Sequence, residues 1–221
     1  MIDLRKGDCL EVMKEIPDKS VDIAFTSPPY NRKRNDKYKN YNDIIEDYYG
    51  FLCNFTDELI RLTKGYVFVN LQKNYYNKKD IFKYIGKYAE KIVEIIIWEK
   101  SNPMPASGKN ITNAYEMFIV LSDISLKSNT TYTKNTITSS VNSNTTLKEH
   151  RAEMKQEISD YFIEKFTNES DTIIDPFMGT GTTGVSCIKY NRNFIGIEID
   201  DKYFEIAKER IENTQKQTTL F

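Results

Sequence analysis

Ser27-Pro28-Pro29-Tyr30 is a short run whose groups suit chemistry on an amino nitrogen. The Ser27 hydroxyl and the Pro28 carbonyl could accept both hydrogens of an exocyclic amino group on a base, whose lone pair is otherwise delocalised into the ring. The prolines fix the turn before substrate arrives, and Tyr30 offers a ring on which an extruded base can stack. The run predicts methylation of such a nitrogen; an ordinary Pro-Pro turn beside a core tyrosine is the alternative.

A second run, Gly179-Thr180-Gly181-Thr182-Thr183-Gly184, matches a G-x-G-x-x-G pattern between an expected strand and an expected helix. Its small residues let the backbone approach a ligand closely at a helix N-terminus. Glu198 ends the next expected strand, where a carboxylate can accept hydrogen bonds from ribose hydroxyls. These features predict a site for a nucleoside-containing cofactor.

Asp175, just before these glycines, bears on which cofactor binds. A carboxylate suits a cationic amine better than a pyrophosphate. Too little chain follows for a whole dinucleotide-binding fold. S-adenosylmethionine is therefore favoured, while a dinucleotide and a purely structural glycine turn remain alternatives.

Strands and helices alternate along the chain, which predicts an α/β protein with a mostly parallel sheet. Apolar and β-branched runs predict strands at 1–6, 21–25, 66–69, 91–98, 117–121, 172–174 and 194–198. Helical spacing of apolar residues predicts helices at 10–16, 44–62, 81–88, 153–166, 185–190 and 202–211, before a polar tail at 213–221. Because ligands bind at the carboxyl ends of such strands, we expect the two turns to face one crevice.

The composition of the chain indicates how many domains to expect and which classes of protein can be excluded. The chain has 221 residues, 39% hydrophobic and 29% charged, so one catalytic domain spanning 1–221 is expected. The net charge of −1 does not by itself indicate that the protein binds nucleic acid. Cys9, Cys53 and Cys187 lack metal-ligand or disulfide spacing, so we expect no metal and a cytoplasmic protein. The longest apolar run, 92–98, is too short for a membrane span.

Together the two turns resemble the motifs of the DNA amino-methyltransferases, which methylate cytosine N4 or adenine N6. In that family a [D/N/S]-P-P-[Y/F] motif binds the target amino group and a D-P-F-x-G-x-G-T-T motif binds S-adenosylmethionine. Ser27 to Tyr30 and Asp175 to Thr183 match them. The catalytic motif comes first, as in the β group. That order implies a circularly permuted Rossmann-like methyltransferase fold, with helices on both faces of the sheet.

The resemblance implies two sets of site residues. The catalytic set is Ser27, Pro28, Pro29 and Tyr30. The cofactor set is Asp8, Asp175, Pro176, Phe177, Gly179, Gly181, Thr182, Thr183 and Glu198, with Asp8 near the adenine. Weaker matches are the segments 98–103, 113–116 and 150–152 and the tail residues Gly196, Tyr203, Ala207 and Arg210; Lys155 replaces a common proline.

A basic run directly after the catalytic turn predicts contact with the phosphates of double-stranded DNA. Its residues are Arg32, Lys33, Arg34 and Lys37. A solvated loop is the alternative. The Ser-, Thr- and Asn-rich segment 122–149 stands where the family carries its target-recognition region. If it is instead a disordered loop, base recognition would come from a second copy, as in a homodimer, or from a separate recognition subunit.

Ser27, where the family often has aspartate, favours cytosine N4 over adenine N6 as the target. Cytosine C5 is disfavoured, because that chemistry needs a cysteine nucleophile, typically after a proline, and no cysteine here follows one. Three further hypotheses remain: amino-group methylation of RNA or a protein glutamine, a dinucleotide-dependent oxidoreductase, and a non-catalytic nucleic-acid-binding subunit with a methyltransferase fold. The intact turns argue against the last.

Overall fold

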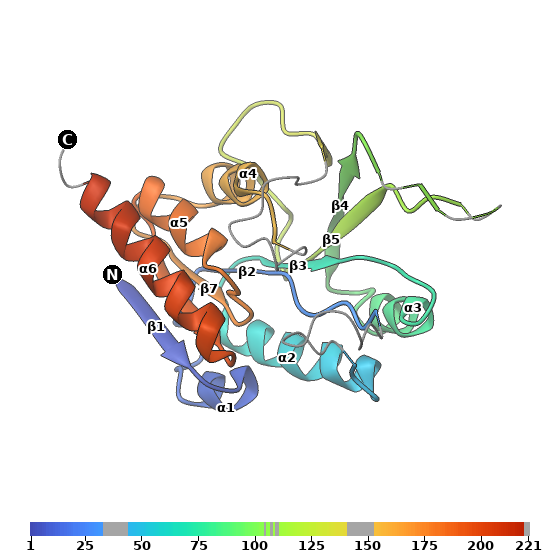
Figure 1. Cartoon of the computed structure of the whole chain (residues 1–221), viewed down its shortest axis with the longest axis horizontal. Helices are drawn as coiled ribbons and strands as arrows, with labels where there is room; N and C mark the ends of the chain where they lie inside the picture. Colours follow the sequence, from blue (N-terminus) through green and yellow to red (C-terminus); the bar gives the residue numbers. More distant parts are fainter. Residues whose placement is uncertain (33–43, 104, 107, 109–110, 141–152, 219–221) are drawn as a thin grey trace.

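The computed structural model describes residues 1–32, 44–103, 105–106, 108, 111–140 and 153–218. Within them, eight strands form one sheet in the order β1-β8-β7-β2-β3-β5-β4-β6, and helices cover both of its faces (Figure 1). The strands are β1 (Ile2–Lys6), β2 (Ile23–Thr26), β3 (Val67–Leu71), β4 (Ile92–Lys100), β5 (Tyr115–Leu121), β6 (Thr136–Ser139), β7 (Thr172–Asp175) and β8 (Asn193–Glu198). The helices are α1 (Cys9–Lys14), α2 (Tyr48–Leu62), α3 (Lys78–Lys87), α4 (Gln156–Phe166), α5 (Thr182–Lys189) and α6 (Asp201–Thr218).

Parallel pairing dominates the sheet, which confirms the predicted α/β architecture. The strands β1, β8, β7, β2 and β3 are parallel neighbours in that order, and β6 is parallel to β4. Among the described strands, β5 alone runs antiparallel to its neighbours, β3 and β4. The turns that follow β2, β3, β7 and β8 therefore lie at one edge of the sheet.

The pleat of β3 divides its side chains between two hydrophobic cores. Val67 and Val69 pack in the core beneath α1, α2 and α3. Phe68 packs in the core beneath α4, α5 and α6, where its ring centroid lies 5.2 Å from that of Phe162. Because both faces of β3 are covered, its sequence is apolar almost throughout, as is usual for a central strand.

The helices α3, α4 and α5 begin within three residues of the sequence prediction, and α2 and α6 differ from it more. α2 begins at Tyr48 instead of residue 44, because the Asp47 carboxylate accepts a hydrogen bond from the Gly50 amide (2.9 Å) and caps the helix there. α6 continues to Thr218, so the predicted polar tail at 213–221 is wrong for its described part. Gln215, Lys216 and Gln217 there favour helix without an apolar stripe. No helix in the described ranges is long and apolar enough to cross a bilayer.

β6 is a strand that the sequence does not predict, inside the polar segment 122–149. It extends the sheet beside β4, where the Trp98 indole donates to the Ser139 hydroxyl at 2.7 Å. The Tyr161 hydroxyl of α4 donates to the Lys134 carbonyl at 2.9 Å. Residues 134–139 thus lie against β4 and α4, whereas 141–149 lie outside the described residues.

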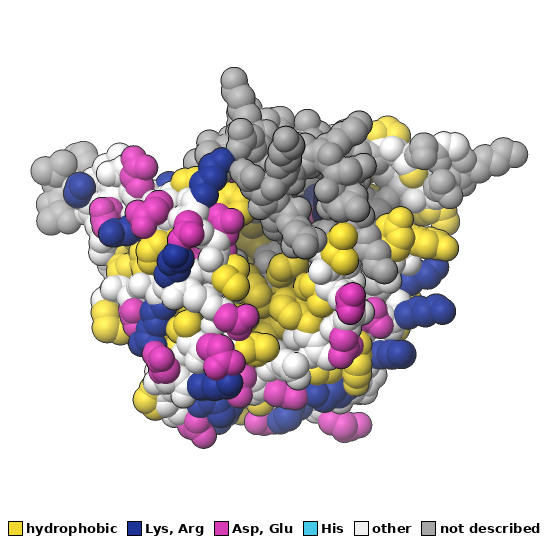
Figure 2. Space-filling view, turned by 60° about the horizontal axis from the view of Figure 1, so that its bottom comes forward, with side chains coloured by type: hydrophobic (Ala, Val, Ile, Leu, Met, Phe, Trp, Pro, Cys, Tyr) yellow, Lys and Arg dark blue, Asp and Glu magenta, His cyan; other side chains and the backbone are white. Residues whose placement is uncertain are grey.

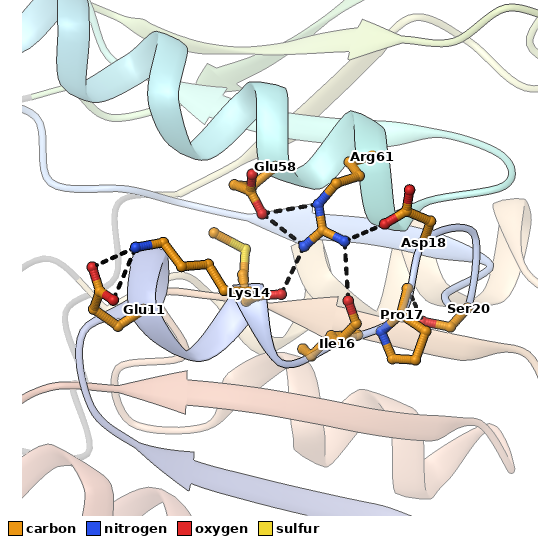
Figure 3. Close-up of polar contacts among 9 residues, drawn as sticks. Glu11, Lys14, Ile16, Pro17, Asp18, Ser20, Glu58 and Arg61 are labelled. Atoms are coloured by element: carbon orange, nitrogen blue, oxygen red, sulfur yellow. Dashed lines mark hydrogen bonds and ion pairs between the residues drawn. The ribbon is translucent and has the colours of Figure 1, made fainter.

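Arg61, in the last turn of α2, holds the loop that leads from α1 into β2 (Figure 3). Its guanidinium donates to the carbonyls of Met13 and Ile16, at 2.8 and 3.1 Å. It also pairs with Glu58 of its own helix and with Asp18 of the loop. These contacts fix the start of β2, the strand that ends at the predicted catalytic turn.

Candidate active site

The two predicted turns meet at one edge of the sheet because their strands are neighbours. β2 pairs in parallel with β7 through Ile23–Ile173 and Ala24–Ile174, so the turn after each strand faces the same cavity. This cavity has a volume of about 530 Å³, within the usual range for a small-molecule site. Figure 2 brings the lower side of Figure 1 forward and shows hydrophobic side chains around a hollow. The expected crevice is therefore present.

Every predicted catalytic and cofactor residue lines this cavity except Gly181. Gly181 instead has φ of +83°, and a Cβ there would lie 3.0 Å from the Cα of Ala207 in α6. It therefore gives α5 its starting conformation and lets α6 approach. Lining residues that the sequence prediction did not assign to the site are Gly7, Cys9, Leu10, Phe25, Ile45, Phe51, Glu153, Met154, Met178, Ile199 and Asp200.

Beneath Ser27 lies a buried polar network that the predicted site did not include. The Tyr30 hydroxyl donates to Glu116 Oε2 at 2.8 Å and lies 2.8 Å from Ser27 Oγ. The Asn70 amide nitrogen lies 2.7 Å from the Tyr30 hydroxyl and 2.8 Å from Glu116 Oε2. Asn70 lies inside β3, not at its end, and is fully buried. In the sequence it was marked only as a polar residue within an apolar strand.

The proton positions in this network follow from counting donors. Tyr30 has one hydroxyl proton, and the acceptor-only carboxylate of Glu116 takes it. The Tyr30 oxygen can therefore only accept from Ser27, so the Ser27 hydroxyl must donate to it. One lone pair of Ser27 Oγ lies toward the Asn70 amide nitrogen, 3.4 Å away, and the other is left to accept a hydrogen from the cavity side.

Glu116 is held in its acceptor role by Lys100. The Lys100 ammonium lies 3.1 Å from Glu116 Oε1, and both side chains are about 10% exposed. Burial lowers the pKa of Lys100 to about 8. Burial also raises the pKa of the Tyr30 hydroxyl well above its ordinary value, and Glu116 adds to that effect, so Tyr30 stays protonated.

The backbone carbonyls of the catalytic turn differ in what they bind. The Pro29 carbonyl accepts from the Tyr48 hydroxyl at 2.9 Å. The Tyr30 carbonyl accepts from the side-chain amides of Asn74 and Asn77, at 2.8 and 2.7 Å. Within the described residues, no donor bonds the Pro28 carbonyl. Pro28 lines the cavity, so its carbonyl and Ser27 Oγ are the acceptors that the turn offers.

Asp175 connects this turn to the glycine-rich turn. Its two carboxylate oxygens accept from the hydroxyls of Thr26 and Thr183, at 2.7 and 2.6 Å. The side chain is 4% exposed, and burial raises its pKa to about 6. Asp175 lines the cavity as predicted, but its carboxylate also braces the two turns.

Glu198 and Asp8 stand at the ends of β8 and β1. Glu198 Oε2 accepts from the Gly179 amide at 2.9 Å and Oε1 from the Asp200 amide at 2.8 Å. Burial raises the pKa of Glu198 above its ordinary value. Asp8 is exposed and caps α1 by accepting from the Leu10 amide at 2.8 Å. Both carboxylates retain lone pairs for a ligand.

Arg210 in α6 supports the glycine-rich turn from behind. Its guanidinium donates to the Thr180 carbonyl at 2.7 Å and to Glu153 at 2.7 Å. Glu153 also accepts from the Thr180 hydroxyl at 3.0 Å. The tail residues matched in the sequence therefore lie against this turn: Tyr203 lines the cavity, Ala207 packs beside Gly181 and Arg210 holds Thr180.

Of the predicted DNA-contacting residues, the structure describes Arg32. Its guanidinium carbon lies 5.3 Å from the centroid of the Tyr30 ring, and it donates to the Gln72 side chain. Arg32 thus lies beside the catalytic turn. Lys33, Arg34 and Lys37 lie outside the described residues.

Comparison with known proteins gives a family match over most of the chain. A family model named for N6 and N4 methyltransferases and described as DNA methylase matches residues 21–138 and 125–209. The Type II methyltransferase M.HinfI of Haemophilus influenzae is 26% identical over 93% of this chain and 67% of its own length. M.MwoI of Methanothermobacter wolfeii, also a Type II methyltransferase, is 32% identical over 92% of this chain and 34% of its own length. The chain thus spans about two thirds of one relative and one third of the other.

Two solved structures share the fold. The PvuII DNA methyltransferase (cytosine-N4-specific) superimposes with a TM-score of 0.79 at 18% identity, over 98% of this chain and 92% of that chain. The M1.HpyAVI–SAM complex superimposes with a TM-score of 0.66 at 24% identity, over 96% of this chain and 99% of that chain. These likenesses confirm the predicted Rossmann-like methyltransferase fold.

Proposed function

This chain belongs to the DNA methylase family of N6 and N4 methyltransferases, and from that premise we propose that it methylates the exocyclic amino group of a base flipped out of double-stranded DNA. S-adenosylmethionine is the methyl donor. The observation that carries the proposal is the pair of open acceptors, Ser27 Oγ and the Pro28 carbonyl, on the wall of the cavity. They match the two hydrogens of an amino group.

The acceptors act on the nitrogen before and during methyl transfer. Two hydrogen bonds from the amino group to Ser27 and Pro28 favour a more tetrahedral nitrogen whose lone pair is free to attack. S-adenosylmethionine supplies an electrophilic methyl carbon on a sulfonium sulphur. The methylated nitrogen is cationic and loses one proton readily, so no strong base is needed at Ser27. The buried network of Tyr30 and Glu116 keeps the Ser27 hydroxyl proton away from the amino group.

The residues around the cavity fit S-adenosylmethionine in size and charge. The volume of about 530 Å³ suits a ligand of this size. The left-handed φ of +53° at Gly179 favours glycine, which leaves the wall without a side chain there. We propose that Glu198 accepts from the ribose hydroxyls, that Asp8 lies near the adenine, and that the Asp175 carboxylate attracts the cationic amine.

Cytosine N4 is the target that we propose, on the grounds of Ser27 in place of aspartate. The PvuII enzyme, whose fold is similar, is named as cytosine-N4-specific. Chemistry at C5 would need a thiolate, yet all three cysteines are buried. Burial raises the pKa of Cys9, the one that lines the cavity, to about 12.

The test is to incubate the purified protein with unmethylated DNA and methyl-labelled S-adenosylmethionine, and then to analyse the nucleosides by mass spectrometry. We expect N4-methylcytosine. Detection of N6-methyladenine would support the proposed amino-group methylation of DNA but would show that the target base is adenine. Label in RNA alone, or no label in DNA when calorimetry shows that the cofactor binds, would contradict the proposed substrate.

A further inference from the structure

We propose that the loop between β3 and α3, with the start of α3, is a contact surface for duplex DNA next to the flipped base. This β3–α3 surface consists of Lys73, Tyr75, Tyr76, Lys78 and Lys79. The inference rests on the proposed function, because it takes DNA as the substrate. It adds a second DNA-contacting segment to the basic run that follows the catalytic turn.

The loop is attached to the catalytic turn. β3 lies parallel beside β2, so the loop leaves the sheet at the same edge as the turn. Asn74 and Asn77 donate to the Tyr30 carbonyl at 2.8 and 2.7 Å, and Arg32 donates to the Gln72 side chain. DNA whose target base enters the cavity must therefore pass close to this loop.

The two tyrosines between these asparagines point outward. Tyr75 is 80% exposed and Tyr76 is 53% exposed. Their ring centroids lie 5.4 Å apart with the rings nearly perpendicular, and the Lys78 ammonium lies 5.3 Å from the Tyr75 centroid. Adjacent exposed rings flanked by a cation are suited to packing against the sugars of a DNA backbone while the cation contacts a phosphate.

The charge of the segment is complementary to phosphate. Residues 72–87 hold five lysines and one aspartate, a net +4 in a chain whose total is −1. Lys87 pairs with Asp57 at 2.9 Å. Lys73, Lys78 and Lys79 form no ion pair with any carboxylate in the described ranges. Figure 2 shows basic side chains along the margin where α3 lies, so these cations are available to neutralise DNA phosphates.

The first test measures how DNA affinity depends on salt, which needs no knowledge of the recognition sequence because phosphate contacts are sequence-independent. The probe is an unmethylated duplex of mixed sequence. Lys78→Ala/Lys79→Ala should reduce the slope of log affinity against log salt by about two, and affinity by about ten-fold. The matched control is Lys208→Ala/Lys216→Ala, which removes two exposed lysines of α6 and should change neither. A slope equal to that of the control would overturn the inference.

The second test concerns the rings. Tyr75→Ala/Tyr76→Ala should weaken binding of the same duplex by about ten-fold, because the apolar area that the rings bury against the backbone sugars is lost. Tyr75→Phe/Tyr76→Phe keeps both rings and should bind as wild type. If the alanine variant binds the duplex normally but loses affinity for RNA, the surface serves RNA and the inference is wrong. If wild type labels DNA while both sets of variants bind normally, this inference fails and the proposed function stands.

Discussion

The Asp175 carboxylate accepts a hydrogen bond from the Thr26 hydroxyl at 2.7 Å, across 149 positions of sequence. Its second oxygen accepts from Thr183 at 2.6 Å. Thr26 directly precedes the catalytic turn, and Thr183 belongs to the glycine-rich turn. One buried carboxylate therefore sets the spacing between the proposed substrate and cofactor positions.

Two substitutions separate the charge of Asp175 from its bracing role. Asp175→Asn keeps two hydrogen bonds, because the amide oxygen accepts from one threonine and the amide nitrogen donates to the other. We expect Asp175→Asn to fold normally and to bind S-adenosylmethionine about ten-fold more weakly, because the charge facing the cationic amine is lost. Asp175→Ala loses the bonds as well, and should cost about 1–3 kcal/mol of stability. Calorimetry and chemical unfolding measure both effects; wild-type affinity in Asp175→Asn would rule out a role for the charge.

The stability of the fold should depend on pH through Asp175. Burial raises its pKa in the folded state from 3.8 to about 6, so the folded state holds the proton more tightly than the unfolded state. Stability should therefore fall as the pH rises from about 4 to about 6, by up to about 3 kcal/mol from this group. Asp175→Asn cannot titrate and should lack this component. Unfolding free energies of the two proteins across this range provide the comparison, and parallel curves would contradict the assignment.

The sequence predicted the two turns because their information is local: prolines, glycines and the strands before them. The start of α2 at Tyr48 depended on the Asp47 cap, and the end of α6 at Thr218 depended on helix propensity. The spacing of apolar residues indicates neither of these. Asn70 and Glu116 lay beyond prediction as a pair, because they reach Ser27 only through the antiparallel pairing of β3 with β5. The available signals were a polar residue inside an apolar strand for Asn70 and, for Glu116, its place in the weakly matched segment 113–116.

Ser27→Ala removes one of the two proposed acceptors for the amino hydrogens. The methyl-transfer rate should fall by about a hundred-fold, comparable to the loss of one pre-oriented hydrogen-bonding group in other active sites. Cofactor binding should change little, because the hydroxyl bonds within the Tyr30 network. Single-turnover transfer to DNA, alongside calorimetry with S-adenosylmethionine, checks both statements. A rate near wild type would refute the role of Ser27.

Glu116→Gln tests the direction in which the hydroxyls of Ser27 and Tyr30 donate their hydrogen bonds. The amide oxygen would turn to Lys100, which leaves the amide nitrogen to donate to Tyr30. That nitrogen would also face a second donor, the Asn70 amide nitrogen, which lies 2.8 Å from this position. Tyr30 would then donate to Ser27, and the Ser27 proton would turn toward the cavity and oppose the amino group. We expect a drop in the methyl-transfer rate close to that of Ser27→Ala, with the cofactor affinity unchanged because Glu116 does not line the cavity.

The matched control for Glu116→Gln is Glu99→Gln, on the strand beside it. Glu99 is exposed and accepts from the Thr138 hydroxyl at 3.0 Å, away from Ser27. The Glu99→Gln substitution should leave the methyl-transfer rate unchanged. Equal methyl-transfer rates in the two variants would show that Glu116 stabilises the fold and does not orient the Ser27 hydroxyl.

Gly181→Ala should destabilise the fold because the backbone there has φ of +83° and the new Cβ would lie 3.0 Å from both Cα and Cβ of Ala207. The strained conformation and the contact with α6 together should cost about 1–3 kcal/mol. Gly86→Ala is the control: it lies in α3 with nothing within 4 Å of the added Cβ, and should stabilise the protein by about 0.5–1 kcal/mol through helix propensity. Chemical unfolding of the two variants should therefore shift in opposite directions. A shift of the same sign in both would mean that α6 can move aside at Gly181, and that this glycine does not set the distance between α5 and α6.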